Sequence, residues 1–394
     1  MKQSILEYAL HEPTTPPPPA YSSRYRFDYL AKLFSANNRE ALRDYFAGHL
    51  TGPLVVDFDP TTACNFSCPE CISANLLNKE KISSERIEDL LREFARAGVK
   101  GIVFIGGGEP LAHTCMPKPL RLAHQLGLDV GLTTNGSLID RHLHAIADCV
   151  AWTRVSMDAG TEQTFLTFRP NKMWRSFDKI IRSMEALAKI KKGALGYSFL
   201  MMQRRVGAEL ITNVTELATA CEIAKSIGCD YFEMKPMFDM DHALVPFGPE
   251  IEKIIDEQII ACRQMATPTF DVITTASVKH LRESFDPSQP KSYSSCPTME
   301  LRTTVTPSGI YPCAYHRGRS DKSLGTVLDG PFDEFWKSAG RRRASQNTDP
   351  SRDCRFFCAR HRLNKVVLSM EDLYGEGIDL LDYIKAENIE DPFF

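Results

Sequence analysis

The sequence contains no apolar run that approaches the ~20 residues needed to cross a membrane. It also carries little net charge, because 47 Lys and Arg residues stand against 50 Asp and Glu residues, for a formal charge of −3. A chain without a basic excess is not expected to attract nucleic acid or an anionic membrane surface. The first residues lack the apolar core of a secretory signal, since Glu7 and His11 interrupt it, so we expect a cytoplasmic protein.

Disorder as a description of the whole chain is excluded by its composition. Of 394 residues, 43% are hydrophobic and 25% are charged, which is ordinary for a protein with a packed core. A length of this size predicts two or three structural units.

Short apolar segments alternate with amphipathic segments along the middle of the chain. We expect strands at 54–58, 101–105, 130–134, 152–157, 195–202 and 229–235, and helices at 82–97, 120–126, 138–149, 177–190 and 214–227. This alternation predicts parallel βαβ units in an α/β fold. Periodicity alone does not separate a partial barrel from a doubly wound sheet, but both place chemistry at the carboxyl ends of the strands.

The rest of the chain divides into four further regions. Residues 1–51, with a proline tract at 16–19 and a helix expected at 24–50, form an N-terminal helical extension. The alternating region occupies 52–245, and a connecting helix and strand occupy 246–290. A small cysteine-rich α+β region is expected at 291–365, followed by an acidic tail at 366–394.

Twelve cysteines in a protein expected in a reducing compartment suggest metal binding, catalysis or burial in a core. Cys64, Cys68 and Cys71 have C-x3-C-x2-C spacing immediately after the first expected strand. Three thiolates on one loop can hold three corners of an iron–sulfur cubane and leave one iron open to another ligand. The alternatives are a structural zinc site, which normally needs four protein ligands, and ordinary core cysteines.

Polar motifs follow the next three strands. The segment of Gly106, Gly107, Gly108, Glu109 and Pro110 follows the second strand. Thr134 and Asn135 end the third strand, Ser156 and Asp158 end the fourth, and Arg169 comes shortly afterwards. Each motif alone is compatible with an ordinary turn or a solvated charge. Together they are expected to meet at one edge of the sheet.

In this order, the motifs resemble those of the radical S-adenosylmethionine (SAM) superfamily, over residues 52–245. The resemblance implies a partial (β/α)6 TIM-like barrel and a [4Fe–4S] cluster on the three clustered cysteines. It also implies that SAM binds the cluster's open iron and that the motifs after strands two to four contact SAM. The reduced cluster would cleave SAM to a 5′-deoxyadenosyl radical that removes a hydrogen atom from substrate. A one-electron donor such as flavodoxin or ferredoxin would be needed.

Four cysteines near the C-terminus, Cys296, Cys313, Cys354 and Cys358, are enough for a second, closed cluster. They resemble the twitch domain, a shortened relative of the SPASM extension that follows radical SAM barrels, which implies an auxiliary [4Fe–4S] cluster. The last spacing is x3 where x2 is common, so Cys358 competes with another nearby ligand, and His316 and His361 flank the set. A structural zinc ion is the alternative.

Candidate catalytic and substrate-binding residues lie at the ends of the last two strands. Glu233 and Lys235 share one face of an extended strand, so the pair either faces a polar substrate inside the fold or forms an outward salt bridge. Asp239 follows the same strand, and Cys115 is a candidate hydrogen-atom donor.

The leading hypothesis is oxidation, epimerisation or elimination on a small polar metabolite such as a sugar, aminocyclitol or nucleoside. The alternatives are maturation of a peptide or protein and a non-catalytic metal-binding role.

Overall fold

The computed structural model of the chain describes residues 29–275, 277–278, 290–326, 330–384 and 392–393. Its centre is a nine-stranded sheet in the order β11-β10-β1-β2-β3-β4-β5-β8-β9. The six middle strands are parallel and confirm the expected partial (β/α)6 barrel; they are β1 (Val55–Phe58), β2 (Gly101–Phe104), β3 (Asp129–Thr134), β4 (Trp152–Ser156), β5 (Ala194–Met201) and β8 (Tyr231–Pro236).

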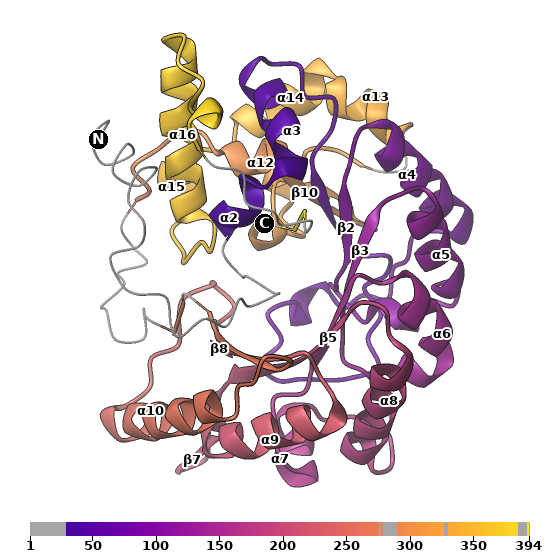
Figure 1. Cartoon of the computed structure of the whole chain (residues 1–394), viewed down its shortest axis with the longest axis vertical. Helices are drawn as coiled ribbons and strands as arrows, with labels where there is room; N and C mark the ends of the chain where they lie inside the picture. Colours follow the sequence, from indigo (N-terminus) through magenta and orange to yellow (C-terminus); the bar gives the residue numbers. More distant parts are fainter. Residues whose placement is uncertain (1–28, 276, 279–289, 327–329, 385–391, 394) are drawn as a thin grey trace.

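Helices cover the convex face of the sheet, one after another around its outside (Figure 1). They are α4 (Ser84–Arg96), α5 (Pro117–Gln125), α6 (Ile139–Cys149), α7 (Glu162–Phe168), α8 (Ser176–Ile190) and α9 (Leu217–Ile227). In α4, Ser83 Oγ accepts a hydrogen bond from the Arg86 amide, and Ile87, Leu91 and Phe94 are buried against the sheet. This apolar layer fixes the strand ends relative to one another.

The concave face is packed against segments from both ends of the chain. α2 (Tyr29–Leu33), α3 (Ala36–Phe46) and α16 (His361–Gly375) share a core with Val55, Val103 and Phe393. Within the described residues, the segment expected to be helical at 24–50 is helical in two pieces, because Ser35 takes an extended conformation (ψ 157°) between α2 and α3. The proline tract lies outside the described residues.

Additional strands extend the barrel sheet at both edges. β9 (Asp271–Thr274) pairs in parallel with β8. At the other edge β10 (Arg302–Thr306) pairs in parallel with β1, and β11 (Gly309–Tyr311) returns antiparallel to β10. The cysteine-rich region is therefore joined to the barrel by backbone hydrogen bonds, through a pairing that brings together residues about 250 positions apart.

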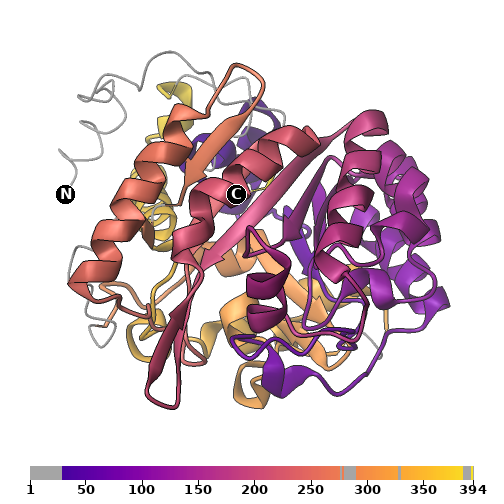
Figure 2. The ribbon, with the colours of Figure 1, turned by 90° about the horizontal axis from the view of Figure 1, so that it is seen from below.

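The other described elements surround this sheet. A hairpin of β6 (Gln203–Val206) and β7 (Glu209–Thr212) projects from the end of β5 (Figure 2). The remaining helices are α10 (Pro249–Gln264), α12 (Pro297–Leu301), α13 (Phe332–Lys337), α14 (Ala339–Gln346) and α15 (Pro350–Asp353). Among the described residues, none of the helices is both long and apolar enough to span a membrane.

Candidate functional site

The first cysteine loop leaves β1 and lies over the carboxyl ends of the strands. Cys64 is exposed, whereas Cys68 and Cys71 are partly buried. The loop is held in place by its backbone, because Phe66 bridges to Asn171 and the Ser67 amide donates to the Pro170 carbonyl at 3.0 Å. The three thiols therefore project from a fixed loop.

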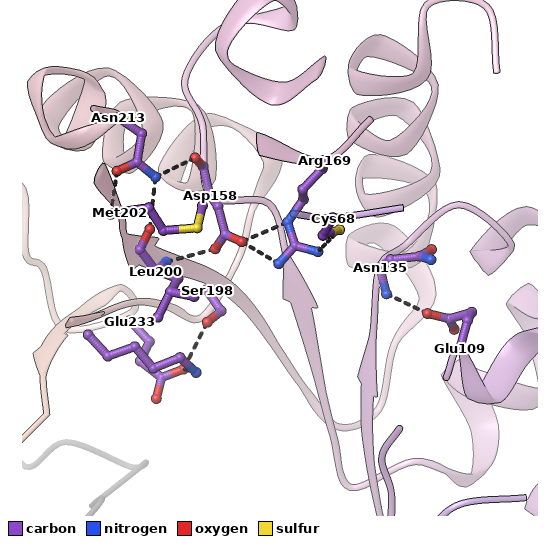
Figure 3. Close-up of polar contacts among 11 residues, drawn as sticks. Cys68, Glu109, Asn135, Asp158, Arg169, Ser198, Leu200, Met202, Asn213 and Glu233 are labelled. Atoms are coloured by element: carbon purple, nitrogen blue, oxygen red, sulfur yellow. Dashed lines mark hydrogen bonds and ion pairs between the residues drawn. The ribbon is translucent and has the colours of Figure 1, made fainter. Parts of the chain in front are cut away.

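Arg169 supplies positive charge directly at these thiols. Its Nη1 lies 3.9 Å from Cys68 Sγ, and its Nε donates to Asp158 Oδ2 at 2.6 Å (Figure 3). Burial raises the pKa of the Cys68 thiol to about 11, and the charge of Arg169 opposes that rise. The same guanidinium favours the thiolate of Cys64. Such a charge lowers the cost of the thiolate form that iron binding requires.

Asp158 is held in place by Asn213, which belongs to none of the sequence motifs. Asn213 Nδ2 donates to the Asp158 carbonyl at 2.9 Å and to the Leu200 carbonyl, while its Oδ1 accepts from the Met202 amide. Asp158 itself has φ 56°, a left-handed conformation that Asp tolerates better than most residues. Its Oδ1 also accepts from the Leu200 amide at 2.7 Å, so the carboxylate is aimed at Arg169 from a rigid position.

The glycine loop after β2 packs directly against the cysteine loop. A Cβ on Gly106 would lie 1.7 Å from the Gly108 carbonyl oxygen, and one on Gly108 would lie 2.3 Å from the Ala63 carbonyl oxygen. The Glu109 amide donates to that same Ala63 oxygen at 2.8 Å. Only glycine fits at the first and third positions, because the loop turns tightly on itself and on the neighbouring loop.

Glu109 is buried and oriented by three hydrogen bonds. Its Oε1 accepts from Thr134 Oγ1 at 2.6 Å and from the Leu111 amide, and its Oε2 accepts from the Asn135 amide at 2.7 Å (Figure 3). Burial raises the pKa of this carboxyl, against the effect of these bonds. A carboxylate oxygen has two lone pairs, so Oε2 retains the capacity to accept from an ammonium group.

The Asn135 side chain faces the cysteine loop. Its Nδ2 donates to Asn65 Oδ1 at 2.9 Å, and its Oδ1 accepts from the Ser137 amide and hydroxyl. Asn65, next to Cys64 in the chain, was not singled out from the sequence. Ser156 ends β4 beside Ser198 of β5 in the sheet register.

These residues fit the cluster and SAM that the motifs imply. Three thiols, a cationic Arg169, a buried Glu109 with an accepting oxygen and a tight glycine loop lie at one edge of the sheet. The contacts of individual residues with SAM stay predictions.

A second polar group lies on the concave side of β4, β5 and β8. Ser198 and Glu233 are register neighbours, and Ser198 Oγ donates to Glu233 Oε2 at 3.2 Å. Lys235 Nζ lies 3.4 Å and Arg154 Nη1 3.5 Å from the same oxygen. Burial disfavours ionisation of Glu233, but Lys235 and Arg154 outweigh it and lower the pKa of that carboxyl. The Glu233 side chain is only 3% exposed, so it faces the interior of the fold and does not form the outward salt bridge that the sequence also allowed.

Two sequence candidates are not brought into this group. Asp239 is exposed, and its Oδ1 accepts from the amides of Asp241 and Ala243, which closes a turn after β8. Cys115 Sγ lies 3.0 Å from His113 Nδ1, near the start of α4 on the outer side of the barrel. Catalytic roles for them stay predictions without support from their contacts.

The four C-terminal cysteines line one cavity. It has a volume of about 30 Å³, and Cys296, Cys313, Cys354 and Cys358 all contribute to its wall. They arrive from separate elements: Cys296 precedes α12, Cys313 follows β11, and Cys354 and Cys358 lie between α15 and α16. Burial raises the pKa of Cys296 to about 12 and of Cys313 to about 11, and the neighbouring thiols add to both rises.

The four thiols surround a shared cavity and give a full ligand set for either a closed iron–sulfur cluster or a single zinc ion. His316 Nε2 lies 3.4 Å from Cys354 Sγ, so the alternative histidine ligand also borders the cavity.

The comparisons with known proteins agree with the barrel and its motifs. Residues 58–232 match the family model of the radical SAM superfamily. The GTP 3′,8-cyclase of Chlorobaculum tepidum is 26% identical over 288 residues, which are 70% of this chain and 82% of that protein. The mycofactocin maturase of Mycobacterium ulcerans is 26% identical over 318 residues, 76% of this chain and 78% of that protein.

The GTP 3′,8-cyclase of Rhizobium leguminosarum is 33% identical over 137 residues. That match covers 33% of this chain and only 38% of the length of the cyclase. Among solved structures, SuiB of Streptococcus suis bound to its precursor peptide SuiA has a TM-score of 0.58 at 13% identity, over 90% of this chain and 80% of that one. That likeness concerns the fold. The matched residues 58–232 contain the first cysteine loop and the motifs that follow β2, β3 and β4, and this part of the chain therefore carries a radical SAM family domain.

Proposed function

We propose that this protein is a radical SAM enzyme that acts on a small polar metabolite bound on the concave side of the barrel. When bound, the cluster on Cys64, Cys68 and Cys71 and SAM supply reductive cleavage of SAM and the oxidant that removes a substrate hydrogen atom. The protein's own contribution is to bind, orient and shield these groups.

The proposal rests mainly on one observation, the inward-facing group of Arg154, Ser198, Glu233 and Lys235. Burying a carboxylate between two cations costs desolvation free energy, and a polar substrate that binds there would explain why the group is present. The charge of Asp158 acts on the Lys235 ammonium, and Asp158 also binds Arg169, which lies beside Cys68. A substrate that hydrogen-bonds this group would therefore lie beside the SAM site.

Three roles follow for these side chains. Glu109 Oε2 accepts a hydrogen bond from the amino group of SAM, and Arg169 balances negative charge at the cluster loop. Lys235, whose side chain is 27% exposed and whose pKa is lowered by burial, is the group best placed to donate a hydrogen bond to substrate. Whether the outcome is oxidation, epimerisation or elimination depends on the substrate.

The four-thiol cavity supports a further part of the proposal, an auxiliary [4Fe–4S] cluster on Cys296, Cys313, Cys354 and Cys358. Arg360, which is close enough to influence the pKa of Cys358, also acts on that of Asp57 at the concave face. A cluster held by these four thiols would supply a buried electron acceptor. A flavodoxin or ferredoxin is the class of donor that we propose for the first cluster.

Peptide modification is the second candidate. It is favoured by the mycofactocin maturase of Mycobacterium ulcerans, which matches 76% of this chain. We rank it second because the inward polar group is compact and carries closely paired charges.

The deciding experiment is anaerobic reconstitution followed by measurement of 5′-deoxyadenosine formed from SAM under dithionite. Formation by wild-type protein but not by the Cys64/Cys68/Cys71→Ala variant supports the enzyme. Metabolite pools separated from peptides by size are then compared for their ability to accelerate cleavage. Acceleration by the peptide fraction alone would replace the first candidate by the second, and absence of iron would remove both.

A further inference from the structure

Arg317 belongs to the second cysteine region by sequence but reaches the first site with its side chain. It follows Cys313 by four residues, immediately after the 3₁₀ turn Ala314–His316. Its side chain is only 8% exposed. Instead of lining the four-thiol cavity, the guanidinium extends to the carboxyl ends of β1 and β2.

Its contacts join three segments that build the SAM site. Arg317 Nε lies 2.8 Å from Oδ2 of Asp59, the residue that follows β1. Nη1 donates to the Gly106 carbonyl at 3.0 Å and to Ser73 Oγ, two residues after Cys71, at 3.4 Å. A planar guanidinium can span such divergent partners, whereas the single ammonium of lysine cannot.

The backbone beside Arg317 also packs on the first cysteine region. Gly318 has φ 76°, and a Cβ there would come within 2.3 Å of Leu76 Cδ2. Leu76 ends the short turn Ala74–Leu76 that follows Cys71. The two cysteine regions are therefore in direct contact through a segment that tolerates no side chain at position 318 without movement.

Stability alone is a poor explanation for this arrangement. Asp59 is fully buried, and burial raises the pKa of its carboxyl to about 7 in spite of Arg317. Within the described part of the chain, Arg317 Nη2 and Asp59 Oδ1 have no hydrogen-bond partner. A buried pair with such incomplete bonding contributes little net stability, so its geometric effect on the loops is the more informative property.

We propose that Arg317 is a positioning residue that holds the Gly106–Gly108 loop in its SAM-binding conformation and so makes SAM binding depend on the second cysteine region. This inference rests on the proposed function, because it requires SAM to bind that loop. The Gly106 carbonyl cannot rotate while Arg317 holds it, and Glu109, three residues later, keeps its direction.

The test compares Arg317→Gln with Arg319→Gln in reconstituted protein. Arg319 is two residues away and exposed, and it forms an ion pair with Asp321. We expect Arg317→Gln to raise the Kd for SAM about tenfold or more, the effect of losing a hydrogen bond to a charged donor. Iron content should match that of Arg319→Gln. Because buried Asp59 loses its counter-charge, Tm is expected to fall, so SAM affinity is measured at a temperature at which both variants are folded. The electron paramagnetic resonance spectrum of the reduced first cluster should shift only at higher SAM concentration.

Arg317→Lys provides partial rescue, since it keeps a charge at Asp59 but loses the fork that reaches Gly106 and Ser73. Its Kd should fall between the other two. Equal SAM affinity in Arg317→Gln and Arg319→Gln would overturn the proposal. Loss of SAM binding together with iron from the first site would also overturn it, because Arg317 would then only maintain the cysteine loop.

A measurement on wild-type protein needs no variant. Because coupling is reciprocal, SAM should slow amide hydrogen exchange in residues 313–318. Unchanged exchange there, with protection at the Gly106–Gly108 loop, would show that SAM binds without engaging the second region. If wild-type protein holds iron and binds SAM, a failure of these tests concerns Arg317 alone; if it does neither, the proposed function fails first.

Discussion

The two cysteine sites differ in how they are assembled and in how far they are open. Cys64, Cys68 and Cys71 come from one loop of eight residues, and Cys64 is exposed. Cys296, Cys313, Cys354 and Cys358 come from separate elements and enclose a small cavity. The first site carries Arg169 against a thiol and Glu109 close by, whereas aromatic side chains such as Tyr315 and Phe356 line the second.

The difference matches two kinds of chemistry. A site that must admit a ligand needs an open position and polar groups to orient it, and a short loop at the strand ends provides both. A site that only holds a group for electron transfer is better enclosed, because exclusion of solvent tunes and protects it. Arg317 connects the two, so they are distinct in environment but not mechanically independent.

The largest expected effects are on iron content and SAM cleavage, when one or the other set of thiols is removed. The Cys64/Cys68/Cys71→Ala variant is expected to keep about four of about eight irons and to lose SAM cleavage entirely. The Cys296/Cys313/Cys354/Cys358→Ala variant should keep the other four irons and some cleavage. Iron analysis and 5′-deoxyadenosine assays check this. Stoichiometric zinc in place of iron in the first variant would show that the second site is structural.

Breaking the ion pair at the open site should cost both stability and SAM affinity. Arg169→Met leaves the 2%-exposed Asp158 without its counter-charge, and we expect a loss of about 3–5 kcal/mol in the free energy of unfolding. The matched control is Arg175→Met, which removes an exposed pair with Asp178 worth at most about 1 kcal/mol. Urea unfolding and SAM titration measure the two effects. Equal losses in both variants would contradict the buried pair's role.

The concave polar group should respond differently from the turn that follows β8. Lys235→Met is expected to lower the substrate-dependent rate about tenfold to a hundredfold through loss of a charged hydrogen bond. Cleavage of SAM without substrate should remain. Asp239→Asn, which retains an oxygen for the Asp241 and Ala243 amides, should change that rate less than about twofold. A larger effect at Asp239 would move the substrate site toward the turn.

A pH dependence of stability is expected from Asp59, which lies at the open site and contacts Arg317. The pKa of its carboxyl is raised from 3.8 to about 7, mainly by burial. Between those values the folded protein keeps a proton that the unfolded chain releases. The free energy of unfolding should therefore fall as pH rises through that window, by at most about 1.4 kcal/mol per pH unit.

Asp59→Asn should remove this part of the slope. Urea unfolding of wild type and Asp59→Asn at pH 5, 6 and 7 measures it. An unchanged slope would indicate that Asp59 is ionised throughout, and Arg317→Gln, which removes the opposing cation, should extend the window to higher pH.

Local patterns were sufficient for the alternation of strands and helices and for the motifs of the open site, whereas the partial barrel followed from the resemblance of those motifs to a known family. The cysteine loop, the glycine loop, Glu109 and Asp158 all follow the end of a barrel strand, and the barrel strands and the helices between them have recognisable periodicities. The segment expected to be helical at 24–50 is interrupted at Ser35, and residues of the two resulting helices share a core with Val55 and Phe393. The carboxylate Glu233 could face either way until the sheet was closed, since a strand pattern does not state which side is covered.

The sequence by itself determined the order of the βα units, the cysteine spacing and the glycine requirement, because all three are consequences of short-range geometry. Only the tertiary structure decided that β10 joins β1, that four distant thiols share one cavity, and that Arg154 and Asn213 support Glu233 and Asp158. It also decided that Arg317 leaves its own region for Gly106. These contacts join residues that are far apart in the chain, and no local propensity carries information about which distant surfaces will meet when the core is buried.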